Sequence, residues 1–184
     1  MKKLISVIII LFLFYSCEKE SSDCFFKKGN KKKKEMLLDD FTSIEVYDIF
    51  NLILIQDTIH KVVLEGSENL LPHVEISVED DTLTIEHSIR CIWLRDYEKI
   101  NIYVKYFRLV GIVPDVPYVT ISTDSIICSN LEYFAIGEIG EANMILNCNY
   151  FRFDGSYSTL GQFRFKGKSD KSRFYVNYGS SLYA

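Results

Sequence analysis

From Phe41 onward the chain alternates apolar and polar residues in short runs. Each run is rich in Val, Ile, Thr and aromatic residues and is bounded by Asp, Asn, Gly, Ser or Pro, which is typical of β-strands. The predicted strands are SIEVYDI (43–49), NLILIQD (51–57), KVVLEG (61–66), VEISVED (74–80), DTLTIEH (81–87), KINIYVKYF (99–107) and YVTIST (118–123). No run has the period of an amphipathic helix, so we predict an all-β body.

Two connections between these strands have a recognisable pattern. SENLLPHV is the one segment that predicts a helical turn, with Ser67 as its cap and with Leu70 and Leu71 facing the core. Asp80 and Asp81 predict a tight turn, because Asp hydrogen-bonds to its own backbone and tolerates unusual backbone angles.

The last third of the chain repeats an aromatic pattern at a spacing near 20 residues. Aligning the segments FAIGEIG (134–140), FRFDGSY (151–157) and FYVNYGS (174–180) predicts one inward column of Phe134, Phe151 and Phe174 and a second of Ile136, Phe153 and Val176. Between these segments, Met144 and Leu146 match Phe163 and Phe165, nineteen residues later. The corners are assigned to Gly140, Gly155, Gly161, Gly167 and Gly179. Such a period predicts a β-solenoid-like stack of coils, each burying its apolar face on its neighbours. An antiparallel sandwich is the alternative.

Residues 1–16 have the parts of a secretory signal peptide: a basic start, an apolar run of twelve residues (4–15), and the small residue Ser16 before Cys17. The run is too short for a transmembrane helix, which needs about 20 apolar residues. The segment FYSC resembles the lipobox of bacterial lipoproteins, which predicts lipidation of Cys17. A plain secretory peptide cut near Ser16 is the alternative.

Residues 17–40 have little apolar periodicity, and six of their lysines lie within eight residues: Lys27, Lys28 and the run at 31–34. Like charges in a block repel one another and stay solvated, so we predict a flexible tether between the membrane and the domain. A basic stripe that binds lipopolysaccharide or nucleic acid is the alternative.

Residues 41–184 are long enough for a single domain with its own core. The whole chain has 21 basic and 25 acidic residues, and its cationic tether leaves the folded part acidic, which argues against a nucleic-acid partner. The cysteines beyond Cys17 are Cys24, Cys91, Cys128 and Cys148, none of them in a C-x-x-C motif. Disulfides are permitted outside the cytoplasm, but widely spaced cysteines are more often small buried hydrophobes, so their pairing is left open.

The segment VVLEGSENLLPHVEISVEDDTLTIEH (62–87), followed by a strand region and by Gly-containing coils, resembles the family described as "putative auto-transporter adhesin, head GIN domain". The resemblance covers nearly all of residues 41–184. It implies a right-handed β-solenoid of the kind found in bacterial envelope lipoproteins, with no catalytic residues to carry over. The segments GEIG and DGSY stand where the family usually has Gly-Ser-Gly corners.

Binding, if it occurs, is predicted to use tyrosines near the C-terminus. The candidate ligand-contacting residues are Tyr157, Tyr175 and Tyr178, and the alternation along the chain points Tyr175 outward. Tyr rings bind well at little entropic cost and sugars stack on them. The alternative is that exposed tyrosines simply cover a sheet face, where aromatic residues are favoured.

Catalysis has weaker support. Stacked coils would bring Glu138 and Asp154 towards the separation of a glycosidase pair, but charged corners are usually just solvated. His60, His73 and His87 are not spaced like metal ligands, and no nucleophile motif is present. We therefore expect no enzymatic activity, no metal and no cofactor.

These observations together predict a lipid-anchored outer-membrane protein of the cell envelope, facing the periplasm or the exterior. Its domain is expected to be a binding or adhesion module that uses the outer face of the stack, with a glycan or an envelope or host protein as ligand. Two alternatives stay open: a structural envelope component that self-associates through its C-terminal edge, and a carbohydrate-active enzyme.

Overall fold

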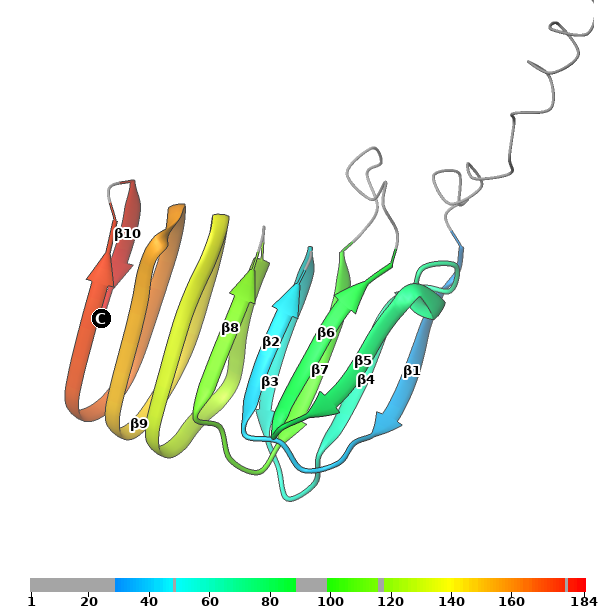
Figure 1. Cartoon of the computed structure of the whole chain (residues 1–184), viewed down its shortest axis with the longest axis horizontal. Coiled ribbons are helices and arrows are strands. Elements are labelled where there is room, and N and C mark those ends of the chain that lie inside the picture. The colour runs from blue at the N-terminus through cyan, green and yellow to red at the C-terminus, as the bar shows by residue number, and fades with distance from the viewer. Residues whose placement is uncertain (1–28, 48, 89–98, 116–117, 178) are drawn as a thin grey trace, which may run out of the picture.

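The computed structural model describes residues 29–47, 49–88, 99–115, 118–177 and 179–184 (Figure 1). This part of the chain is nearly all β, with one 3-10 turn, η1 (Leu71–His73), and no α-helix. The ten strands are β1 (Lys31–Leu37), β2 (Ser43–Tyr47), β3 (Phe50–Gln56), β4 (Lys61–Ser67), β5 (Val74–Glu79), β6 (Thr82–His87), β7 (Ile100–Tyr106), β8 (Gly111–Asp115), β9 (Tyr118–Val176) and β10 (Ser180–Tyr183).

All the strands belong to one curled sheet in the order β1-β4-β7-β3-β9-β8-β2-β6-β5, with β10 also paired to β9. The long strand β9 joins two arms, because its start pairs with β3 (Asn51 with Val119) and a later part pairs with β8 (Gly111 with Glu132). Buried side chains from both arms form a single apolar cluster. The core therefore lies inside the curl, between the two arms (Figure 1).

Strand direction differs between the two ends of the sheet. The pairs β1–β4, β4–β7 and β5–β6 at the N-terminal end are antiparallel, whereas the pairs β3–β9, β8–β9 and β10–β9 are parallel. The parallel register joins Gly161 to Ser180 as well as Gly111 to Glu132, so these partners lie about 20 residues apart. This offset agrees with the spacing that the sequence predicts.

The predicted strands from residue 43 to residue 123 are all present, and the predicted turn is confirmed, since Asp80 and Asp81 have φ angles of 47° and 60°. The prediction of Ser67 as a helix cap is wrong. Ser67 ends β4, and its hydroxyl accepts a hydrogen bond from the Gly29 amide at 3.0 Å. The sequence also misses β8, because Pro114 within it weakens the strand pattern.

The predicted flexible tether over residues 17–40 is corrected in its last part, where Lys31–Leu37 forms the edge strand β1 against β4. Acidic partners offset the repulsion among its lysines: Lys32 contacts Glu68 at 2.6 Å, and Glu35 pairs with Lys61. The hydrogen bond from Lys61 lowers the pKa of Glu35 below its usual value. A lysine-rich edge also resists pairing with other chains.

The predicted inward columns are shifted by one residue at the first coil. Tyr133 and Ala135 are fully buried, whereas Phe134 is half-buried and Ile136 is 37% exposed. Because side chains alternate between faces along a strand, a slip of one residue exchanges the inward and outward sets. Val176, also predicted to face inward, is exposed. The match of Met144 and Leu146 with Phe163 and Phe165 is confirmed, since all four side chains are buried.

The predicted corner glycines are confirmed only in part. Gly167 and Gly179 have the positive φ angles that suit glycine at a turn, and so does Gly137, which was not assigned to a corner. At Gly155 and Gly161 the neighbouring Phe ring leaves no room for a Cβ, so glycine is needed there for space instead.

A disulfide within β9 and the side-chain hydrogen bonds of Gln56 in β3 link neighbouring strands. Cys128 and Cys148 form a disulfide with their Cα atoms 4.8 Å apart. The Gln56 side chain reaches across a corner, donating to the carbonyls of Phe107 (3.1 Å) and Ile127 (3.0 Å) and accepting from the Ile127 amide (2.9 Å). The sequence predicts neither link.

Candidate binding site

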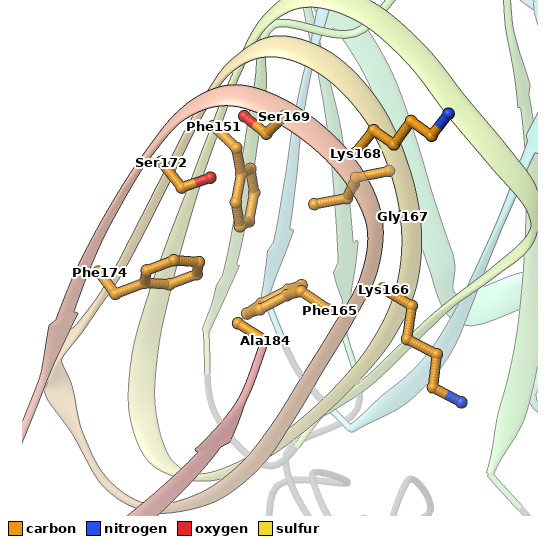
Figure 2. Close-up of a pocket in the computed structure, with 10 residues that line it drawn as sticks. Phe151, Phe165, Lys166, Gly167, Lys168, Ser169, Ser172, Phe174 and Ala184 are labelled. Atoms are coloured by element: carbon orange, nitrogen blue, oxygen red, sulfur yellow. The ribbon is translucent and has the colours of Figure 1, made fainter.

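A hollow of about 350 Å³ lies at the C-terminal end of the curled sheet, inside the last turn of the chain (Figure 2). Its apolar walls are three aromatic rings. The centroid of Phe151 lies 4.9 Å from that of Phe165 and 5.9 Å from that of Phe174, in edge-on arrangements that aromatic pairs favour. The other lining residues are Leu146, Lys166, Gly167, Lys168, Ser169, Ser172 and Ala184.

The shape of the hollow depends on a tight turn at Gly167. This residue has a φ of 121°, and a Cβ built on it would lie 1.9 Å from the Leu146 carbonyl oxygen. Only glycine permits both the backbone angle and this close approach. The turn therefore carries the chain from Phe165 on one side of the hollow to Phe174 on the other.

Polar groups surround the mouth of the hollow without filling it. The Ser172 hydroxyl points into the hollow, whereas the Lys166 and Lys168 side chains point away from it (Figure 2). The Ser169 hydroxyl donates to the Lys171 carbonyl at 2.8 Å, which steadies the turn. The interior is thus apolar, and exposed cationic side chains lie around it.

The last turn of the chain is basic, in contrast to the rest of the domain. Residues 161–184 contain five basic residues and one acidic residue, whereas residues 41–160 contain 7 basic and 18 acidic residues. All six charged side chains of the last turn are exposed: Arg164, Lys166, Lys168, Asp170, Lys171 and Arg173. We call the five basic residues of this set, all but Asp170, the basic rim.

A second candidate surface lies on the outer face of β9. The Arg152 guanidinium lies 5.0 Å from the ring centroid of Phe134 and 5.4 Å from that of Tyr175. It also contacts Asp154 at 3.2 Å and Glu132 at 3.9 Å. We call Phe134, Arg152 and Tyr175 the outer column. Tyr175 is 46% exposed, so its outward direction is as the alternation predicts.

The structure describes the other predicted site residues only in part. Cys17 and Tyr178 lie outside the described residues, and so do the side chains of Tyr157 and Glu138. Asp154 is not a solvated corner carboxylate, because it is only 7% exposed and is held by Arg152. Asp154, the second member of the predicted pair with Glu138, is therefore engaged in an ion pair with Arg152.

The three histidines take up structural positions. His60 bonds through Nδ1 to Asp40 at 2.8 Å and packs on Phe41, and the rings of His73 and His87 lie 6.4 Å apart. Within the described ranges, no group of three or more His, Cys, Asp or Glu residues could hold a metal ion. Over the same ranges, no helix is long and apolar enough to cross a membrane.

Sequence reasoning assigned Phe151, Phe165 and Phe174 to the core and did not identify the hollow that they line. The available signal was the segment GKSDKSR (167–173), where positive charges replace apolar residues at the end of an aromatic repeat. This change of charge distinguishes the surface formed by residues 167–173 from that of the preceding turns.

The model of the family described as "Putative auto-transporter adhesin, head GIN domain" matches residues 40–184, and the chain belongs to this family. Three solved structures share the fold, and all three are described as putative adhesins. The structure from Bacteroides fragilis NCTC 9343 is 12% identical, with a TM-score of 0.63 over 83% of this chain and 96% of that one.

The structure from Parabacteroides merdae ATCC 43184 is 13% identical, with a TM-score of 0.52 over 85% of this chain and 97% of that one. The structure from Parabacteroides distasonis ATCC 8503 is 17% identical, with a TM-score of 0.53 over 84% and 76% of the two chains. No curated protein matches the chain significantly. Identities this low establish the shared fold and leave the ligand to be inferred from the site.

Proposed function

We propose that this protein is a non-catalytic adhesin-type module that binds a glycan or a protein of the envelope or host through its outer face. The outer column carries the proposal. It presents an exposed Tyr175 ring beside the Arg152 guanidinium on a continuous strand. Aromatic rings stack on sugar faces, and a rigid Tyr adds contact area at little entropic cost. Family membership supports the same function.

The proposed scaffold for this face is a right-handed β-solenoid. Parallel pairing at offsets of about 20 residues along β9 supports it, as does the disulfide between Cys128 and Cys148, which are 20 residues apart. In such a stack each turn contacts only its neighbours, so side chains on successive turns form columns at fixed spacing. Binding would therefore use an extended face in place of a deep pocket.

We further propose that the module is a lipoprotein of the outer membrane, held through a lipidated Cys17 after removal of residues 1–16. The disulfide supports an extracytoplasmic location, because such bonds persist in oxidising compartments. Several acyl chains on Cys17 would suffice for stable anchoring, since one chain gives only marginal binding. A Cys17→Ala protein is expected in the soluble fraction without acylation, and its retention on the membrane would exclude this anchor.

A glycan array tests the binding function. The purified chain is expected to be retained on a subset of envelope or host glycans without cleaving them, and Tyr175→Ala is expected to abolish this retention. Tyr47→Ala is the matched control, because Tyr47 is similarly exposed (40%) but lies on β2. Cleavage of a glycan, or equal losses in the two variants, would contradict the proposal.

A further inference from the structure

We propose that a groove beside Phe107 is a second binding site and that it takes a saccharide carrying a carboxylate. The Phe107 ring would cover the apolar face of one sugar, and Arg108 would pair with the carboxylate. The side-chain amides of Asn147 and Asn149 would bond to hydroxyls. The groove shares no residue with the outer column, so it can bind or fail to bind independently of it.

The groove lies where several strands end or turn together. Phe107 and Arg108 directly follow β7, and Gln56 ends the neighbouring parallel strand β3. Two turns of β9, at residues 127–129 and 147–149, supply the rest of its lining. The cavity between these segments has a volume of about 530 Å³, which is within the range of ligand pockets.

Phe107 gives the groove an apolar platform. Its side chain is 61% exposed, although Tyr106 directly before it is buried. Phe107 also lines a second hollow, of about 420 Å³, together with Gln56, Asp57 and Thr58. It therefore stands between two spaces that a ligand can occupy. A pyranose ring presents a face of C–H groups, and covering that face with an aromatic ring removes apolar surface from water on both sides.

Arg108 gives the groove a positive charge that the described protein leaves unmatched. Lys61, Lys105 and Arg152 are each paired with a carboxylate. No ion pair engages the exposed Arg108 within the described ranges. Asp57 of the neighbouring hollow is held by Lys105 at 2.8 Å, so its charge is already matched. A guanidinium binds a carboxylate through two parallel N–H···O bonds, which favours an acidic sugar over a neutral one.

Side-chain amides line the wall that β9 supplies. Asn147 and Asn149 are exposed and flank the buried Cys148, so both face outward. The disulfide from Cys148 to Cys128 fixes this turn beside the turn that carries Ser129. Among the described residues, no hydrogen bond engages either amide. An amide both donates and accepts hydrogen bonds, as a hydroxyl does, so two amides on one rigid wall suit the neighbouring hydroxyls of a sugar.

The backbone beside the groove is already hydrogen-bonded, which disfavours a peptide as the occupant. The Gln56 side chain donates to the carbonyls of Phe107 and Ile127 and accepts from the Ile127 amide. A peptide that adds to a sheet as a strand needs such backbone groups for itself. The groove instead offers a ring, a guanidinium and side-chain amides, which suit a ligand rich in hydroxyls.

Isothermal titration calorimetry with the purified full chain tests the site. The acidic probes are trigalacturonate, for acidic polysaccharides, and 3′-sialyllactose, for sialylated host glycans. The matched neutral probes are the trimethyl ester of trigalacturonate and lactose. We expect at least one acid to bind and its neutral counterpart to bind at least tenfold more weakly. The acid that binds more tightly identifies the source of the ligand.

Protein variants locate the contact. Phe107→Ala should weaken binding of the acid by about tenfold or more, because the platform is lost. Ile139→Ala is the control, since Ile139 is also an exposed apolar residue (52%) but does not line the groove. Arg108→Gln should remove the preference for the acid over its neutral counterpart, whereas Lys168→Gln, in the basic rim, should keep it. All four variants change exposed side chains, so their unfolding midpoints should match that of the parent protein.

Each contrary result overturns a stated part. Failure of both acids to bind would exclude the site, and equal binding of an acid and its neutral counterpart would exclude the pairing with Arg108. Heptaglutamate should bind at least tenfold more weakly than the acidic saccharide, and equal binding would exclude a saccharide as the specific ligand.

A comparison with the outer column separates the two proposed sites. Binding lost in Tyr175→Ala but kept in Phe107→Ala would support the outer column and overturn the groove. Binding lost in Phe107→Ala but kept in Tyr175→Ala would support the groove and exclude the outer column as the site for this ligand.

Discussion

The two ends of the curled sheet finish in different ways. At the N-terminal end, antiparallel strands close the sheet, and η1 crosses from β4 to β5, placing Leu70 and Leu71 in the core cluster. At the C-terminal end, parallel strands stop with Phe165 and Phe174 around an open hollow. The described residues thus cover the core at one end and surround an apolar hollow at the other.

The two ends of the sheet also differ in how their charged residues are paired. The lysines of the edge strand β1 meet acidic residues of the neighbouring elements, as in the pairs of Lys32 with Glu68 and Lys33 with Glu65. The last turn has five basic residues and one acidic residue of its own. The comparison teaches that the N-terminal end balances its charges with neighbouring acidic residues, whereas the last turn carries an excess of exposed basic residues.

The largest effect is expected from a substitution that disturbs the close stacking of the parallel end. Gly167→Ala should lower the free energy of unfolding by about 3 kcal/mol or more, because the new Cβ would meet the Leu146 backbone and the φ angle is unfavourable. Gly111→Ala is the control, since its Cβ would meet only the Ser43 hydroxyl at 3.1 Å. Denaturant unfolding of both variants gives the comparison. Equal losses would mean that the turn at Gly167 is not a tight contact.

Removal of the disulfide is expected to have the next largest effect. Reduction should lower the free energy of unfolding by about 3 kcal/mol, the value for a loop of about 20 residues. The variant with Cys128→Ser and Cys148→Ser should show the same loss and should no longer respond to dithiothreitol. If the reductant destabilises this variant as well, the bond responsible is a different one.

A matched pair of leucines compares packing at the two ends directly. Leu64→Ala, in the closed end, should cost about 3 kcal/mol, because the cavity is enclosed. Leu146→Ala should cost about 1–2 kcal/mol less, because Leu146 lines the hollow and solvent can enter the space. Chemical unfolding of the two variants measures the difference. A greater loss for Leu146→Ala would show that the C-terminal hollow is closed in solution.

The smallest effect concerns alkaline pH in the closed part. Burial raises the pKa of Tyr106 in β7 above its usual value of 10.0. The unfolded chain therefore releases this proton from about pH 10 upward while the folded chain retains it, so stability falls as pH rises. Tyr106→Phe should remove about 1 kcal/mol of this loss between pH 9 and pH 11. If the two proteins lose the same stability between pH 9 and pH 11, ionisation of Tyr106 is not the cause of the loss.

Much of the fold could be predicted from the sequence, because strand alternation and turn residues are local signals. The strands up to residue 123 and the turn at Asp80 and Asp81 follow from them. The one-residue slip at Phe134 could not be predicted, because FAIGEIG alternates equally well in either register. Burial of Tyr133 in its place depends on packing against Phe153 from the next turn, which is a long-range contact.

The candidate sites were predictable to a smaller extent. The outward direction of Tyr175 follows from alternation, but its neighbour Arg152 comes from the preceding turn and is set by the register of β9. The sequence predicts a tether where β1 forms, because the lysines of β1 are stabilised by Glu65 in β4 and by Glu68 just after it, more than 30 residues away. Local patterns do not contain such pairings.

The stacking of strands across the long axis also has a mechanical consequence (Figure 1). Tension between the two ends of the chain would pull across the ladder and separate neighbouring strands one hydrogen bond at a time, which requires little force. The bond between Cys128 and Cys148, which are 20 residues apart in sequence, removes the segment between them from this extension. At about 3.4 Å per residue, nearly 70 Å of contour length stays out of reach until a covalent bond breaks. The protein would then lengthen under load only up to a fixed limit.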